Sequence, residues 1–436
     1  MSFWFDYTTK RLNYNQSYRF YVENLIILCL HKITMKKFEL KNKIKVAYRQ
    51  NKNTPRIGMS LNVAINKPEK MAGIYSIMNR LLLQGTKTRS AEQLANELDA
   101  NAIEVSCDMK QDYLRFRVVC LNEDLDLALE LLQDIIENST FAEFEKEKVK
   151  LEGEIPAELD SARTRALDNF VKTLFKNHFY GNTFTKIEEN LDKITQQDVI
   201  DAYKEIMNDG KKVLSFVGDM NFDTIENLLN KHLGNLPNDE SHECEIPMPH
   251  LEKAETVEFI KPDANQAQIF QGWQVPTITS EEYPAFVVLN TLLGASGLSS
   301  RLFCELRDKK GLAYTVRSSY EIYKKCANFN IYIATEPKNI QTSLDGFKEE
   351  IQKIKDVLVP EQELTNAKNN YIGKLQFITE TNAQQANQMA HHAILGMGFG
   401  FKDELINKIK AVTPEQVQNI ARKYLNDVSV VSILRP

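Results

Sequence analysis

The chain has 436 residues, which is too long for one ordinary core and sufficient for two domains of about 200 residues each. Its composition, with 43% hydrophobic and 26% charged residues, is typical of a globular protein. The formal net charge is −5 with both signs interspersed, so no strong basic field exists to attract nucleic acid or an anionic membrane. We therefore expect neither of these partners.

The first 35 residues are predicted to lie outside the folded domains. They are rich in Tyr, Asn and Phe, and their apolar run at 25–30 is too short to span a bilayer or to form a secretory signal. Since residues 35–37 read MKK, like an ordinary protein start, we interpret 1–35 as a disordered leader or an upstream extension of the gene model. The six cysteines are far apart and form no C-x-x-C pair, which predicts reduced thiols, and we expect a cytoplasmic protein.

From residue 44 onward the hydrophobic pattern alternates between the period of a strand and that of a helix, which is typical of an α+β fold. The elements expected in the first half are, in chain order, a strand over 57–64, a helix over 71–83, a helix opened by a capping box from Ser90 to Gln93, a strand over 112–120, a helix over 125–136 and a strand over 213–218.

The second half of the sequence repeats the first. Residues 194–199 read ITQQDV and precede a helix and a strand, and residues 412–417 read VTPEQV in the same context. Asn-x-Leu-Leu likewise occurs on a helix at 79–82 and again at 290–293. We therefore expect two homologous domains, each a mostly antiparallel sheet with helices packed on it, and a ligand site in the cleft between them.

A composition change marks the boundary between these domains. Residues 237–256 are rich in Pro, Asp, Glu and Ser and show no periodicity, which predicts an exposed, extended linker. We place the N-terminal domain at 36–236 and the C-terminal domain at 257–436.

Side chains that commonly carry hydrolytic chemistry are sparse. Seven histidines occur, but no His-x-x-x-His or His-Glu-x-x-His motif and no G-x-S-x-G nucleophile elbow. The one local cluster of candidate metal ligands is His242, Glu243 and Cys244 with His250, inside the predicted linker. Flexible loops hold metals poorly without supporting contacts, so we interpret this cluster as solvated linker, with a metal site as the alternative.

The predicted helix over 71–83 carries a more specific signal, because residues 81–86 read LLLQGT. This ending resembles that of the zinc-binding helix in the pitrilysin and insulinase-like metallopeptidases, which carries the inverted motif His-x-x-Glu-His. By this resemblance the positions of His, Glu and His are occupied by Ser76, Asn79 and Arg80. Their i, i+3, i+4 spacing places them on one helix face, so the face is kept although the ligands are absent.

These three residues are unsuited to the family's chemistry. Zinc takes imidazole, thiolate or carboxylate ligands, for which Ser76 and Asn79 are poor substitutes. The permanently charged guanidinium of Arg80 repels a metal cation. An amide at Asn79 cannot act as the general base that activates water. The resemblance therefore implies that this chain holds no zinc.

The family's remaining zinc ligand is a Glu about 75 residues further on, and the resemblance assigns that position to Glu154, with Glu152 as a less suitable match. Glu154 is then a vestigial ligand. The alternative is one more exposed helical Glu, and Pro156 indicates that the helix is bent here.

The C-terminal domain departs less from the family. Residues 299–303 read SSRLF and residues 305–316 read ELRDKKGLAYTV, which closely resembles the family signature S-S-R-L, L-R and K-G-L-A-Y. In that family an Arg and a Tyr seven positions apart reach toward the scissile bond, and Arg307 and Tyr314 match them. A guanidinium and a phenol are donors suited to the negative charge of a tetrahedral intermediate. Without the resemblance these two residues read as a surface helix Arg and a half-buried strand Tyr.

The resemblance extends from about residue 36 to the C-terminus and includes HFYG at 178–181, where we expect His178 to be structural. Some family members of this length work in pairs, as in the mitochondrial processing peptidase. The resemblance implies a non-catalytic subunit that forms a clamshell half, binds no cofactor itself and supplies Arg307 and Tyr314 in trans to a homologous zinc-containing partner with His-x-x-Glu-His. The substrate would be an unstructured peptide that adds a strand to a sheet edge. The alternatives are a structural or peptide-binding protein without a catalytic partner, and peptide hydrolysis through an unrecognised site.

Overall fold

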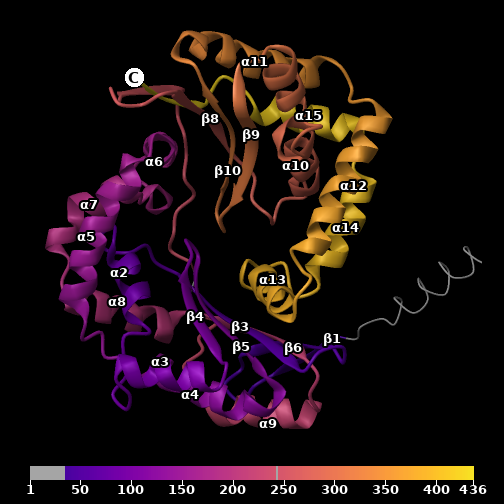
Figure 1. The fold of residues 1–436 in the computed structure, drawn as a ribbon. Helices are drawn as coiled ribbons and strands as arrows, with labels where there is room; N and C mark the ends of the chain where they lie inside the picture. Colours follow the sequence, from indigo (N-terminus) through magenta and orange to yellow (C-terminus); the bar gives the residue numbers. More distant parts are fainter. Residues whose placement is uncertain (1–34, 242–243) are drawn as a thin grey trace, which may run out of the picture.

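The computed structural model describes residues 35–241 and 244–436, which form two halves that each contain one β-sheet covered by helices (Figure 1). This arrangement confirms the expected α+β class. Apart from Met35, the predicted leader lies outside the described residues, as do His242 and Glu243 of the linker cluster. Within the described ranges, no helix has the length and apolarity needed to cross a membrane.

The first half is built on a six-stranded sheet with the strand order β1-β2-β6-β3-β5-β4. Only the β2–β6 pair is parallel. The strands are β1 (Met35–Glu39), β2 (Lys45–Gln50), β3 (Arg56–Ala64), β4 (Glu104–Met109), β5 (Tyr113–Leu121) and β6 (Lys212–Gly218). The helices are α2 (Ile74–Leu81), α3 (Ala91–Ala100), α4 (Leu125–Asn138), α5 (Phe144–Asp160), α6 (Ala162–Leu174), α7 (Phe184–Asn190), α8 (Gln196–Asp209) and α9 (Phe222–His232).

The second half is built on a five-stranded sheet with the order β7-β11-β8-β10-β9, in which only β7 and β11 are parallel. The strands are β7 (Glu255–Ile260), β8 (Ala267–Val275), β9 (Ala313–Ile322), β10 (Ala327–Thr335) and β11 (Val430–Arg435). The helices are α10 (Tyr283–Asn290), α11 (Ile340–Asp356), α12 (Glu361–Phe377), α13 (Asn382–Ile394), α14 (Phe401–Ala411) and α15 (Pro414–Tyr424), with π-helical turns η4 (Thr291–Ala295) and η5 (Phe303–Lys309).

The two sheets share one topology. Without β1, both have the same order of strands along the chain, and the parallel pair occupies the same place in each. Thr195 and Thr413, the matching positions of the sequence repeat, start α8 and α15 with the same capping box. The duplication predicted from the sequence is therefore present in the fold.

Most predicted elements of the first half lie within one or two residues of the observed ones. Ser90 and Gln93 form the predicted capping box at the start of α3. The helix predicted over 71–83 is shorter, because it begins only after Gly73, whose φ of 110° is not helical, and α2 ends at Leu81.

The halves exchange one helix each, which the sequence patterns did not predict. Helix α13 of the second half packs on β3 and β6 of the first sheet, and α6 of the first half packs on β8 and β11 of the second. A glycine in each sheet permits the close contact. Gly58 lies against the backbone of Ala383 in α13, and Gly272 lies against the ring of Phe170 in α6. Each half therefore completes its core with a helix from the other.

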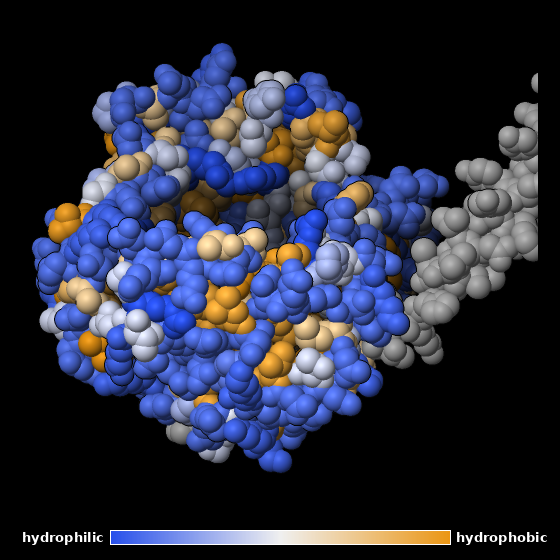
Figure 2. Space-filling model, turned by 60° about the horizontal axis from the view of Figure 1, so that its bottom comes forward, coloured by the Kyte–Doolittle hydropathy of each residue, from blue (hydrophilic) through white to orange (hydrophobic). Residues whose placement is uncertain are grey.

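Residues 237–256, predicted to form an exposed and extended linker, agree with that prediction only in part. The described residues between α9 and β7 contain no helix or strand. The prediction that this stretch is exposed was wrong for Ile246, which is 1% exposed and belongs to the core of the first half. Burial of Ile246 holds the segment between α9 and β7 against the first half. Seen from below, the molecule has a hollowed centre, and hydrophilic residues surround most of its rim (Figure 2).

Candidate functional site

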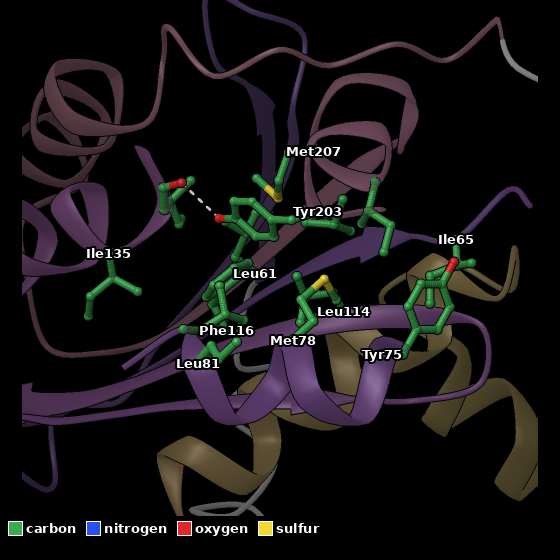
Figure 3. Packing of buried hydrophobic residues seen from close by; sticks show 14 of the residues in the cluster. Leu61, Ile65, Tyr75, Met78, Leu81, Leu114, Phe116, Ile135, Tyr203 and Met207 are labelled. Carbon is green, nitrogen blue, oxygen red and sulfur yellow. Dashed lines mark hydrogen bonds between the residues drawn. The ribbon is translucent and has the colours of Figure 1, made fainter. Parts of the chain in front are cut away.

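The apolar face of α2 anchors the helix in the core of the first half. Met78 and Leu81 point toward the sheet, where Leu61 of β3 and Phe116 of β5 lie, and Tyr75 lies beside Ile65 (Figure 3). Because these positions recur at helical spacing, the polar residues between them are turned to the opposite side. The sequence of α2 thus decides which of its residues face away from the core.

Ser76, Asn79 and Arg80 on that opposite side line a pocket of about 490 Å³. All three side chains are half-buried. The other walls come from the end of β4 with the loop that follows it, and from α5 and α7. Asn79 is held in place, because its Oδ1 accepts a hydrogen bond from the backbone N of Met109 at 2.9 Å. The predicted degenerate zinc face is therefore the wall of a real pocket.

Arg80 joins this face to α5 through two carboxylates. Its Nη1 donates to Glu154 Oε1 at 3.1 Å, and Nη2 makes a second contact with the other oxygen of Glu154. Glu147 Oε2 lies 3.8 Å from Arg80 Nη1. The hydrogen bond from Arg80 lowers the pKa of Glu154 below its usual range, so Glu154 is ionised at neutral pH. A guanidinium thus occupies the place between the carboxylates of α5.

Glu154 was predicted as the vestigial ligand on a helix bent at Pro156. The structure brings Glu154 to Arg80, but α5 runs as one helix from Phe144 to Asp160 through Pro156. The sequence reasoning missed Glu147, which is 4% exposed. Its spacing of seven residues from Glu154 places both on one face of α5, and that signal was readable in the sequence.

This set of side chains does not fit a zinc ion. A serine hydroxyl, an amide already hydrogen-bonded to Met109 and a guanidinium provide no anionic or imidazole ligand, and Glu154 is engaged by Arg80. In residues 35–241 and 244–436, no three His, Cys, Asp or Glu side chains are grouped so that they could hold a metal ion.

Arg307 and Tyr314 lie together in the second half. Arg307 is in the π-helical turn η5, Gly311 reverses the chain with a φ of 63°, and Tyr314 is the second residue of the edge strand β9. The Arg307 guanidinium carbon is 5.2 Å from the centre of the Tyr314 ring and 4.3 Å from that of Phe303. Tyr314 is 81% exposed, so the expectation of a half-buried strand aromatic does not hold. The pair presents two donors to the outside of the chain.

His178 has the structural role expected of it. Its Nδ1 accepts a hydrogen bond from the backbone N of Tyr180 at 3.0 Å, which requires the proton on Nε2, and Nε2 donates to Pro247 O at 3.0 Å. Burial lowers the pKa of His178 and favours this neutral form. His178 therefore ties the turn after α6 to the connecting segment.

Two family profiles match most of the chain. Residues 45–187 match "Insulinase (Peptidase family M16)", and residues 193–371 match "Peptidase M16 inactive domain". The break between the matches falls within the first half and not at the linker.

Curated relatives cover nearly the whole chain. An uncharacterised zinc protease of Bacillus subtilis is 26% identical over 411 residues, which span 92% of this chain and 98% of the relative. An uncharacterised zinc protease of Rickettsia felis is 26% identical over 367 residues, which span 84% and 88% respectively.

Solved structures share the fold. A protease from Helicobacter pylori superposes with a TM-score of 0.83 at 21% identity, covering 92% of this chain and all of the other. A peptidase M16 inactive domain from Pseudomonas fluorescens superposes with a TM-score of 0.84 at 20% identity, covering 92% and 98%.

Proposed function

This chain belongs to peptidase family M16, and we propose that it is the non-catalytic subunit of a two-chain zinc metalloendopeptidase. The observation that carries the proposal is the ion pair of Arg80 with Glu154, which joins two of the positions where the family holds its metal. The chain keeps the helix, the pocket and one carboxylate, but it has an internal cation where a metal would bind.

The electrostatics of this pocket support a structural role for Arg80. Arg80 neutralises Glu154 and lies near the buried Glu147, which also receives an ion pair from Lys150. Glu147 is buried, so without Arg80 it would depend on Lys150 alone to offset the cost of its desolvation. Arg80 therefore stabilises the frame that remains after the loss of zinc ligands, and zinc is assigned to the partner subunit.

Arg307 and Tyr314 supply the part that the chain would contribute to catalysis. The Tyr314 phenol is exposed and Arg307 is half-buried beside it, and a guanidinium beside a phenol can stabilise the oxyanion of a tetrahedral intermediate formed on the partner. The required partner is a homologous subunit that carries His-x-x-Glu-His.

The open sheet edges support an extended peptide as substrate. Strand β4 is the edge of the first sheet and its last residue, Met109, lines the Arg80 pocket, while β9 is the edge of the second sheet and carries Tyr314. An unstructured peptide can add itself to such an edge through backbone hydrogen bonds. A peptide paired with these edges would then lie beside the Arg80 pocket and beside Tyr314.

The test is turnover of an unstructured peptide by a complex of this chain with an active homologue. Replacing Tyr314→Phe or Arg307→Ala should lower kcat on the order of 10²-fold, as for other oxyanion donors, with a smaller effect on peptide binding. Arg317→Ala is the matched control, because Arg317 is exposed on the same strand.

Undiminished kcat from an assembled complex would overturn this role and favour an enclosing subunit that donates no catalytic group. Failure to assemble with any active homologue, combined with peptide binding by the chain alone, would favour the alternative of a peptide-binding or structural protein without a catalytic partner.

A further inference from the structure

A second pocket, of about 80 Å³, lies where the two halves meet, away from the Arg80 pocket. Its walls come from the end of β2 in the first half and from α13 and the start of α14 in the second. Arg49, His392 and Lys402 are the basic side chains that line it, and Asp403 is the acidic one. The family site does not use any of these residues.

Two buried polar atoms in this pocket have no hydrogen-bond partner. Seven such side-chain atoms occur in the described ranges, and Arg49 Nε and His392 Nδ1 are two of them. His392 is 5% exposed, and its ring packs edge-on against Phe401 at 5.1 Å. Buried polar groups in native proteins are nearly always paired, so two unpaired atoms in one small pocket indicate a site for a polar ligand, to which His392 Nδ1 donates in the tautomer that carries its proton there. An Nε–H of arginine can only donate.

Lys402 adds a third donor. Its Nζ donates to Gln376 Oε1 at 3.2 Å and to Thr379 Oγ1, which leaves one of its three ammonium protons unassigned. Burial and repulsion from Arg49 lower the pKa of Lys402, and Asp403 offsets only part of this effect. Burial together with the nearby His391 and Lys402 lowers the pKa of His392 to about 3. His392 is therefore neutral at pH 7, and the charged side chains that line the pocket are the two cations Arg49 and Lys402 and the one carboxylate Asp403.

The start of α14 faces the same space. Gly400, Lys402 and Asp403 line the pocket, and the N-cap Gly400 provides no side chain to accept hydrogen bonds from the first backbone N–H groups of the helix. The start of an 11-residue helix carries a partial positive charge, although the backbone N–H groups of Phe401 and Asp403 already donate to Gly398 O and Gly400 O. The start of α14 therefore favours an anionic ligand, as the basic side chains of the pocket do.

We propose that this pocket binds a tetrahedral oxyanion, for which inorganic phosphate is the probe. A tetrahedral anion presents acceptor oxygens in several directions at once, as donors from β2, α13 and α14 require. Because Arg49 belongs to the first half and His392 and Lys402 to the second, the bound anion joins the halves at the exchanged helix α13. It would stabilise the packing of the two halves of the chain against each other.

The test is titration of the full chain with phosphate by calorimetry at pH 7 and constant ionic strength. Saturable binding of one phosphate per chain is expected, and Lys402→Met should weaken it by about tenfold or more, as loss of a charge-assisted hydrogen bond does. Lys410→Met is the matched control, because Lys410 is an exposed lysine on the same helix and does not line the pocket. The phosphate affinity of Lys410→Met should equal that of the wild type.

A second variant keeps the proposal testable if Lys402→Met fails to fold. Lys402→Gln retains a polar group for Thr379 while removing the charge, and it should also weaken phosphate binding. Sulfate should compete with phosphate and acetate should not. The proposal is overturned by the absence of saturable binding, by wild-type affinity in both Lys402 variants, or by equal competition from acetate.

Discussion

Gly58 sets how closely the exchanged helix α13 approaches the first sheet, and Gly58→Ala is expected to destabilise the protein strongly. A Cβ at this position would lie 2.5 Å from Ala383 Cα and 2.5 Å from Asn382 C, with Ala383 N nearer still. All three atoms belong to the backbone, so no side-chain rotation can relieve the overlap. Ordinary contact begins at 3.4 Å, and α13 must therefore move away by about 1 Å.

The cost combines overpacking with weakened hydrogen bonds at the junction. Overpacking in a core costs about 1–3 kcal/mol. The shift also stretches the hydrogen bond from Asn382 Nδ2 to Arg56 O, at 2.7 Å, and the one from Ser215 Oγ to Ala386 O, each worth about 0.5–1.5 kcal/mol net. The expected total is about 2–6 kcal/mol, a large part of the roughly 5–15 kcal/mol that keeps a domain folded.

The assay is thermal and urea unfolding followed by circular dichroism. At about 2–4 °C per kcal/mol for a unit the size of one half, about 200 residues, the melting temperature of Gly58→Ala should fall by about 4–24 °C. Gly373→Ala is the control, because Gly373 lies inside α12 with no atom within 4 Å of its added Cβ, and it should gain about 0.5–1 kcal/mol. A Gly58→Ala protein that matches the wild type within about 0.5 kcal/mol would refute the close packing inferred for α13.

Three further outcomes are expected. The purified wild-type chain should carry no stoichiometric zinc by metal analysis, whereas the combined change of Ser76→His, Asn79→Glu and Arg80→His should take up about one zinc per chain, because it restores anionic and imidazole ligands beside an existing carboxylate. The free energy of unfolding should fall as the pH drops from about 6.5 to about 4. Burial lowers the pKa of His391 to about 4, so in this pH range His391 takes up a proton only in the unfolded chain. The contribution of His391 to the pH dependence is up to about 3 kcal/mol and should be lost in His391→Gln. Gly272→Ala should lower the melting temperature as Gly58→Ala does, because its Cβ would lie 2.5 Å from the ring of α6 that covers the second sheet.

These outcomes can each fail separately. Stoichiometric zinc in the wild type would refute the assignment of the degenerate site, and a folded triple variant without zinc would remove Glu154 as a vestigial ligand. Equal pH profiles for the wild type and His391→Gln would show that His391 titrates normally in the folded protein. An unchanged melting temperature for Gly272→Ala would show that the two exchanged helices are not held alike.

The sequence was sufficient for the features that depend on neighbours along the chain. Helical spacing in α2 placed Ser76, Asn79 and Arg80 on one face, and the capping box at Ser90 predicted the start of α3. The repeat around Thr195 and Thr413 predicted a helix after each of them. Such signals are short-ranged, because they depend on backbone geometry within one or two turns. The repeat of these signals in both halves was enough to predict the duplicated α+β fold.

Only the tertiary structure decided which distant residues meet. Arg80 and Glu154 are 74 residues apart, and their pairing depends on how α2 and α5 pack. The exchange of α6 and α13 and the junction pocket of Arg49 with Lys402 join residues from opposite halves. Periodicity states only that a helix face is apolar and must be buried, not which sheet covers it, because burial of apolar surface is non-directional. Which helix covers which sheet depends on shape at Gly58 and Gly272, where the absence of a side chain lets a helix from the other half come close.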